Sequence, residues 1–200
     1  MKNELIIVAA VGVAAALAGC TSTTVVDPES YTEVDGAMAT MAANYIDGNG
    51  VLLDGVNSSA TPLTNVPAVG SGAASATYNG FVGGDVTGGA GALAGRNLVG
   101  ELELTADFNG GTISGTADNF YDDTNAQYTG TLNLAGPITG IADPMMTPNL
   151  AGNLSNGGID YATDIAFDGF FVGDAYEAVA GQAFGTVDGG AFDGAFVAER

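Results

Sequence analysis

Apolar and polar residues alternate in short stretches from about residue 73 to the end of the chain. The stretch 98–108 is the clearest, with Leu102, Leu104 and Ala106 at every second position and acidic or threonine residues between them. A period of two is typical of a β-strand with one buried and one solvated face. We predict strands over 74–82, 98–108, 112–117, 128–135, 138–142, 149–154, 159–167 with an extension over 170–172, 181–187 and 192–198.

Glycine-rich turns separate these strands, and Asn109-Gly110 is the strongest hairpin signal in the chain. The segment 83–96 is expected to be a glycine-rich loop, and 118–126 an acidic loop. Glycines also lie inside several strands, where they permit the coiling that a small barrel requires. We therefore predict an all-β fold, an antiparallel up-and-down β-barrel of about eight strands. A β-sandwich is the alternative. The strand faces are set by alternation, so Ile159 and Gly130 are expected to point inward.

The segment before the barrel has a different character. Val34, Met38 and Met41, followed by Ala42 and Tyr45, recur at helical spacing, which predicts a short amphipathic helix over 34–46. We expect Asp47-Gly48-Asn49-Gly50 to end this helix. The predicted organisation is a removed signal (1–19), a flexible tether (20–33), an N-terminal segment with the helix and a loop (34–72), and the barrel (73–200).

The first twenty residues have the form of a bacterial export signal. Lys2 precedes an apolar run over 5–17 that is short for a membrane span. The run closes on Leu17-Ala18-Gly19-Cys20, which resembles the lipobox of bacterial lipoproteins. This resemblance implies that Cys20 is lipidated, becomes the new N-terminus and holds the chain on a membrane. The alternative is an ordinary secretory signal followed by an unrelated cysteine.

The composition limits the chemistry that the chain can perform. Its formal net charge is −20, and after residue 19 the only cations are Arg96 and Arg200. Such a surface repels nucleic acid, so no nucleic-acid partner is expected. There is no histidine, and Cys20 is the only cysteine. Imidazole-based catalysis is therefore absent, and we predict a protein that is not an enzyme, with no cofactor and no metal site. Apolar residues make up 46% of the chain, enough to form a core.

Several groups of residues are nevertheless candidates for a functional site. Asp47 with its glycine turn, Asp85 and the Asp122-Asp123 pair offer oxygen ligands to Ca²⁺, although turn chemistry is the expected role of Asp-Gly pairs. Glu101 and Glu103 share a strand face, where a solvated wall is expected rather than a catalytic pair. The glycine pairs Gly83-Gly84 and Gly88-Gly89 resemble phosphate loops, but no lysine follows them and the local charge is negative, so no phosphate site is expected. The aromatic residues Tyr121, Tyr128, Phe170 and Phe171 are expected mainly in the core, and the alternative is an exposed contact patch on loops.

Parts of the strand pattern resemble the transferrin-binding protein B-like β-barrel lipoproteins. The similar stretches are Val66-Pro67-Ala68-Val69-Gly70 leading to Ala76-Thr77-Tyr78-Asn79-Gly80, the hairpin Leu104-Thr105-Ala106-Asp107-Phe108 with Gly111-Thr112-Ile113-Ser114-Gly115, and the ending from Gly190-Ala191-Phe192 to Arg200. The resemblance implies an eight-stranded barrel on an outer-membrane lipoprotein, often at the cell surface. Relatives capture transferrin, haem-carrying proteins or complement regulators. The chain has one barrel where the transferrin binder has two lobes, and no ligand residues are carried over.

The sequence thus predicts a lipid-anchored outer-membrane or surface lipoprotein whose barrel is a non-enzymatic binding module. Its expected partners are the membrane, through Cys20, and a protein or small ligand such as a nutrient, an iron or haem source, or a host protein. The alternative is a structural envelope lipoprotein without a specific ligand. The chain is expected on the outer membrane, at the cell surface or on the periplasmic face.

Overall fold

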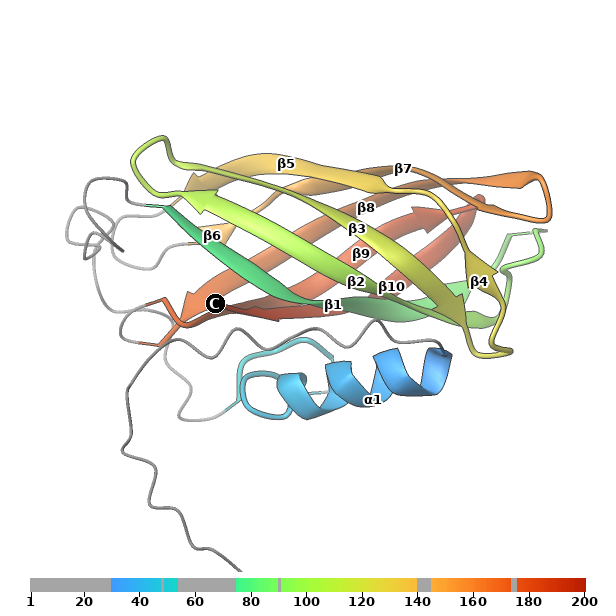
Figure 1. Ribbon diagram of the computed structural model, residues 1–200, viewed down its shortest axis with the longest axis horizontal. Helices are drawn as coiled ribbons and strands as arrows, with labels where there is room; N and C mark the ends of the chain where they lie inside the picture. The colour runs from blue at the N-terminus through green and yellow to red at the C-terminus, as the bar shows by residue number, and fades with distance from the viewer. Residues whose placement is uncertain (1–29, 48, 54–74, 90, 140–144, 174–175) are drawn as a thin grey trace, which may run out of the picture.

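One helix and ten strands make up the computed structural model of the chain (Figure 1), which describes residues 30–47, 49–53, 75–89, 91–139, 145–173 and 176–200. The elements are α1 (Tyr31–Ala42), β1 (Ser75–Thr87), β2 (Arg96–Asp107), β3 (Thr112–Asp122), β4 (Gln127–Tyr128), β5 (Leu132–Thr139), β6 (Met145–Met146), β7 (Asn149–Asn156), β8 (Ile159–Val172), β9 (Ala178–Val187) and β10 (Gly190–Glu199).

The sheet closes on itself, because β1 pairs with β2 on one side and with β10 on the other. Eight strands form the ring in chain order: β1, β2, β3, β5, β7, β8, β9 and β10. The short β4 pairs with β3, and the short β6 lies between β5 and β8. All pairings are antiparallel. The predicted eight-stranded up-and-down barrel is confirmed, and closure excludes the sandwich.

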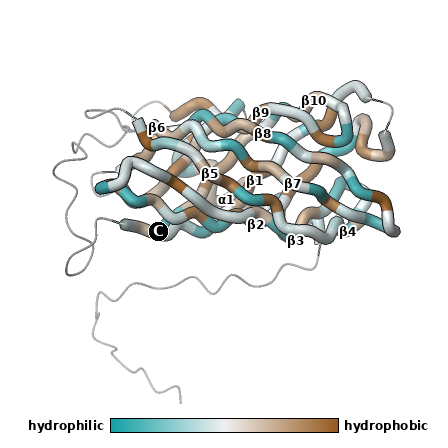
Figure 2. Tube along the Cα trace, turned by 90° about the horizontal axis from the view of Figure 1, so that it is seen from above, coloured by the Kyte–Doolittle hydropathy of each residue, from teal (hydrophilic) through white to brown (hydrophobic). Residues whose placement is uncertain are grey.

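The alternating residues place one apolar face inside this ring. On β2, Leu102 and Leu104 are buried inside while Glu103 is exposed outside. Figure 2 shows this alternation as hydrophilic and hydrophobic residues that follow one another along the strands. Aromatic rings fill much of the interior: Phe167 stacks on Phe196 with ring centroids 4.5 Å apart, and Phe108 lies 5.2 Å from Phe171. The interior is therefore a packed core, as expected for eight strands.

Two inward-facing glycines make room for these rings. A Cβ at Gly100 would lie 2.7 Å from the Phe120 ring, and a Cβ at Gly169 would collide with the Phe196 ring. A glycine beneath an aromatic ring lets the ring lie flat against the strand. Gly169 thus continues the inward face of β8 from Phe167 to Phe171, and these in-strand glycines shape the core.

Five predictions about individual segments were wrong. The predicted strands 128–135 and 138–142 do not exist as such, because β5 runs without a break over Leu132–Thr139 and residues 127–128 form the separate short strand β4.

Two further errors concern segments predicted as loops. The segment 83–87 is not a loop, because β1 continues to Thr87 and is hydrogen-bonded on both sides. Residues 118–122 belong to β3, where a bulge at Asn119 (φ +53°) shifts the register opposite Val99 and Glu101. In both segments, hydrogen bonding to neighbouring strands outweighs the tendency of the local sequence to form a turn.

The other two errors concern strand faces. Ile159 is 59% exposed, because it is the first residue of β8 and lies at the open end of the barrel, directly after the Gly157-Gly158 turn. Gly130 is exposed with φ +116°, outside the regular strands. The alternation of apolar and polar residues alone does not show where such strands end.

Helix α1 packs against the outside of the barrel, beneath β1 and β10 in the view of Figure 1. The predicted helix exists but begins at Tyr31, inside the range predicted as tether, and ends at Ala42. Its predicted apolar positions do face the wall: Val34, Met38 and Met41 join clusters that include Phe81 and Val197. Within the residues that the structure describes, no helix has the length and hydropathy to cross a bilayer.

Candidate functional site

The start of helix α1 is held by the β3–β4 loop. The side-chain oxygen Oδ1 of Asn125 accepts a hydrogen bond from the Tyr31 backbone N–H at 2.8 Å. Ser30 occupies the N-cap position, but its hydroxyl donates to Glu33 and makes no cap bond to the backbone. The first N–H groups of a helix have no partner within the helix. A residue 94 positions away therefore caps α1 and fixes where its first turn lies.

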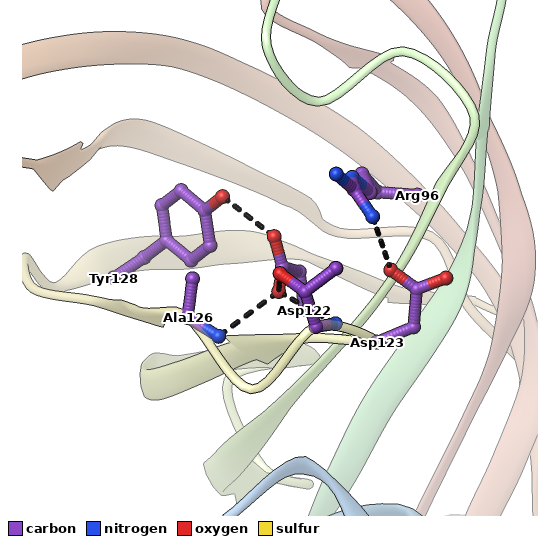
Figure 3. A network of polar contacts seen from close by, with 6 residues as sticks. Arg96, Asp122, Asp123, Ala126 and Tyr128 are labelled. Carbon is purple, nitrogen blue, oxygen red and sulfur yellow. Dashed lines mark hydrogen bonds and ion pairs between the residues drawn. The ribbon is translucent and has the colours of Figure 1, made fainter.

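The loop that presents Asn125 is itself organised by Asp122 (Figure 3). Oδ1 of Asp122 accepts hydrogen bonds from Thr124 N, Thr124 Oγ1 and Ala126 N at 2.9, 2.6 and 3.0 Å, and Oδ2 accepts one from the Tyr128 hydroxyl at 2.9 Å. Burial acts to raise the pKa of Asp122, but these hydrogen bonds outweigh it and lower the pKa below its ordinary value of 3.8. Burial, together with Asp122, raises the pKa of Tyr128.

The other end of α1 leads into a tight turn that docks on β9. The Asp47 carboxylate accepts the backbone N–H groups of Asn49 and Val51 at 2.8 and 3.0 Å, and Gln182 donates to the Asn49 carbonyl at 3.2 Å. Gly50, with φ +73°, approaches β9 so closely that a Cβ there would lie 2.8 Å from the Gly181 oxygen. Both ends of the helical segment are thus attached to the barrel.

A groove of about 270 Å³ lies between α1 and the barrel wall. Strand backbone at Gly83, Gly84 and Gly194 forms part of its floor, and the outward position of Gly83 has no side chain to fill it. Gly84 and Gly194 are cross-strand partners on β1 and β10. Met38 of α1 lies against this floor, where a Cβ at Gly83 would be 3.0 Å from the Met38 sulfur. The glycines of 83–84 thus shape a groove and belong to no phosphate loop.

The groove is acidic. Asp85 on β1 lies directly opposite Asp193 on β10, and Asp35 of α1 also lines the groove. Like charges opposite one another destabilise an antiparallel pair, so the Asp85–Asp193 pair is unfavourable to the fold. Burial and then Asp35 raise the pKa of Tyr31 at the same groove. The arrangement attracts cationic groups.

A second tyrosine marks the far end of α1. Burial and a hydrogen bond to Glu199 raise the pKa of Tyr45 to about 12. Tyr45 therefore stays protonated at neutral pH, and it joins the helical segment to the last residues of β10.

The structure gives the predicted calcium candidates separate roles. Asp122 is a buried cap for its loop, Asp123 forms an ion pair with Arg96 at 3.5 Å, and Asp47 closes its turn. Asp85 lies in strand β1, where we had expected a loop. Among the described residues, no three His, Cys, Asp or Glu side chains are grouped so that they could hold a metal ion. Turn chemistry accounts for Asp47 and Asp122.

Glu101 and Glu103 lie on the outer wall of β2, as the alternation predicted. Glu101 is half-buried and accepts a hydrogen bond from Asn119 Nδ2 at 3.1 Å, and Asn119 in turn accepts one from Gln127 at 3.1 Å. Glu103 is exposed. Two shallow, open depressions border these residues, of about 360 and 230 Å³. The network holds Asn119 in its bulge and ties β2 to β4.

The four aromatic candidates all lie in strands and form no exposed patch. Tyr121 is buried under α1, Tyr128 is buried against Asp122, and Phe171 belongs to the barrel core. Phe170 points outward and is half-buried beside β6 and β9. Packing accounts for their positions.

Cys20 lies outside the described residues, so its predicted lipidation rests on the sequence. Neither a comparison with protein-family models nor a search of curated proteins finds a match for this chain. The groove beside α1 was not predicted. Two of its carboxylates, Asp35 and Asp193, are unremarkable in the sequence, and only the fold brings them beside Asp85.

Proposed function

We propose that this protein is a bacterial lipoprotein, anchored to the outer membrane through Cys20, whose barrel is a non-enzymatic binding module. The observation that carries the proposal is the export signal ending on Leu17-Ala18-Gly19-Cys20, placed before a folded barrel. The outer wall supports the placement of the barrel beside a membrane rather than within it. Exposed carboxylates such as Asp107, Asp118 and Asp164 would be costly in hydrocarbon.

Binding must then occur on the outer surface, because packed side chains fill the interior. The acidic groove beside α1 is the concave surface that we assign to a partner, and its charge favours a partner that presents cationic groups. The resemblance to transferrin-binding protein B-like lipoproteins suggests iron or haem sources or host proteins as ligand classes.

The anchor is tested by expressing the full chain in a bacterium that has an outer membrane. Mass spectrometry of the N-terminal peptide should find Cys20 acylated, and Cys20→Ala should release the protein from the membrane fraction. Ser22→Ala, two residues away, is the matched control and should remain membrane-bound. An unmodified Cys20, or a Cys20→Ala chain that stays in the membrane, contradicts the proposal.

The packed interior also favours a second candidate, a structural envelope protein that acts as a hydrated spacer. Deletion of the gene distinguishes the two. Loss of a binding module impairs use of a specific iron or haem source, and only wild type restores it, not the double variant Asp85→Asn/Asp193→Asn. Loss of a spacer instead raises sensitivity to detergents, and the double variant restores resistance as well as wild type does.

A further inference from the structure

The barrel has two distinct ends, and the chain enters the described structure at one of them. The Asn125 end comprises the β3–β4 loop, the β7–β8 turn and the β9–β10 turn. The Asn109 end comprises the β2–β3 turn and the last residues of the chain, and lies on the opposite side of the barrel in Figure 1. The hydrogen bond from Tyr31 to Asn125 places the start of α1 at the Asn125 end.

The distance from Cys20 to this point is limited by chain length. Cys20 and Ser30 are ten residues apart, and ten residues at full extension reach about 35 Å. The barrel itself has a similar length. The longest strand, β8, has 14 residues, which at the usual rise and barrel tilt corresponds to about 33 Å along the axis.

We propose that the Asn125 end faces the bilayer and the Asn109 end points away from it. This orientation rests on the proposed lipidation of Cys20. With the Asn125 end down, Ser30 lies near the lipid surface and any tether conformation is allowed. With the Asn109 end down, Ser30 stands about 33 Å above the lipid, so nearly full extension of the tether is required, at a large cost in conformational entropy. The Asn109 end is then the part of the barrel farthest from the lipid. The groove beside α1 opens to the side, in the half of the wall nearer the bilayer, because Asp85 and Asp193 lie toward the Asn125 end of β1 and β10.

Energy transfer from a labelled residue to the membrane tests this orientation. Acylated Cys20 does not react with maleimide dyes, and the chain has no other cysteine, so one added cysteine takes the label. Ile159→Cys marks the Asn125 end and Asn109→Cys the other, and both side chains are exposed. The lipidated proteins are reconstituted on phosphatidylcholine vesicles that carry acceptor dye on the headgroups of the outer leaflet.

We expect at least about twofold more transfer from position 159 than from position 109. Equal transfer, as from a barrel lying on its side, or greater transfer from position 109 overturns the orientation. Protein that fails to float with the vesicles overturns the lipid anchor instead, so the two failures are distinguishable. A third sample, with about twenty glycine and serine residues inserted between Thr24 and Val25, relaxes the limit on reach. The difference should shrink there, and a difference of unchanged size contradicts the role assigned to tether length.

Discussion

Two sectors of the barrel wall differ in the side chains that point outward: the covered sector, which lies under α1, and the open sector, formed by β5, β7 and β8. Under α1, the outward residues Phe81, Val99, Tyr121 and Val197 are apolar or aromatic, and none is more than 8% exposed. Across β5, β7 and β8 most outward positions are polar or small, as at Asn133, Asn153 and Asp164, and these three face water. The covered sector is thus apolar on both faces, while the open sector follows simple alternation.

The difference shows how a helix docks on a closed barrel. An amphipathic strand can bury one face only, so a second layer requires strands that are apolar on both faces. The neighbouring pairs Phe81-Val82, Leu98-Val99 and Phe120-Tyr121 supply these positions on three adjacent strands. The run 195–198 supplies them on β10. In each pair one residue fills the barrel and the other meets α1.

The largest expected effect on stability comes from removing a buried aromatic ring in the covered sector. Phe81→Ala removes a ring that is 8% exposed beneath α1 and should lower the free energy of unfolding by about 3 kcal/mol, measured by urea denaturation. Phe184→Ala removes the same ring from an outward position on β9 that is 47% exposed, and should cost less than about 1 kcal/mol. Equal losses would show that α1 does not make its sector part of the core.

A smaller, pH-dependent effect should come from the loop that holds α1. Asp122 has a pKa below 3.8 in the folded chain, so its stabilising contribution is fully present above pH 3.8 and disappears as the pH falls through the folded value. Asp122→Asn should cost about 1–2 kcal/mol at pH 7, since it weakens hydrogen bonds to a charged acceptor. The deficit relative to wild type should shrink below pH 3.8. Exposed Asp164→Asn on the open sector is the control, and a deficit that does not change with pH contradicts the assignment.

The fold was largely predictable because alternation records burial directly. The pattern Leu102–Leu104–Ala106 against Glu103–Thr105 places β2 and its inner face without further information. The strand ends were not predictable, because Thr87 and Asp122 are kept in strands by partners distant in sequence. Paired apolar residues such as Leu98-Val99 break the alternation and could have located the covered sector.

The groove was harder to predict than the barrel. Asp85 and Asp193 lie 108 positions apart and meet only because β1 and β10 close the ring in one register. Asn125 likewise reads as an ordinary loop residue, and its role as the cap of α1 depends on the bulge in β3 and the Asp122 cap that follows it. Such contacts are set by closure, which local pattern does not encode.

The smallest expected effect tests whether this cap or the apolar contact determines where α1 starts. Asn125 has φ +66°, so Asn125→Gly removes the acceptor without backbone strain, whereas alanine would add strain. Loss of a helix cap costs about 1 kcal/mol, so amides in the first turn of α1 should exchange hydrogen about fivefold faster. Asn125→Asp keeps an acceptor oxygen and adds a charge that a helix N-terminus favours, so it should exchange no faster than wild type. Unchanged exchange in Asn125→Gly would mean that the apolar contacts of Val34 alone hold the first turn. Faster exchange throughout α1 would instead make the cap, rather than the covered sector, the main attachment of the helix.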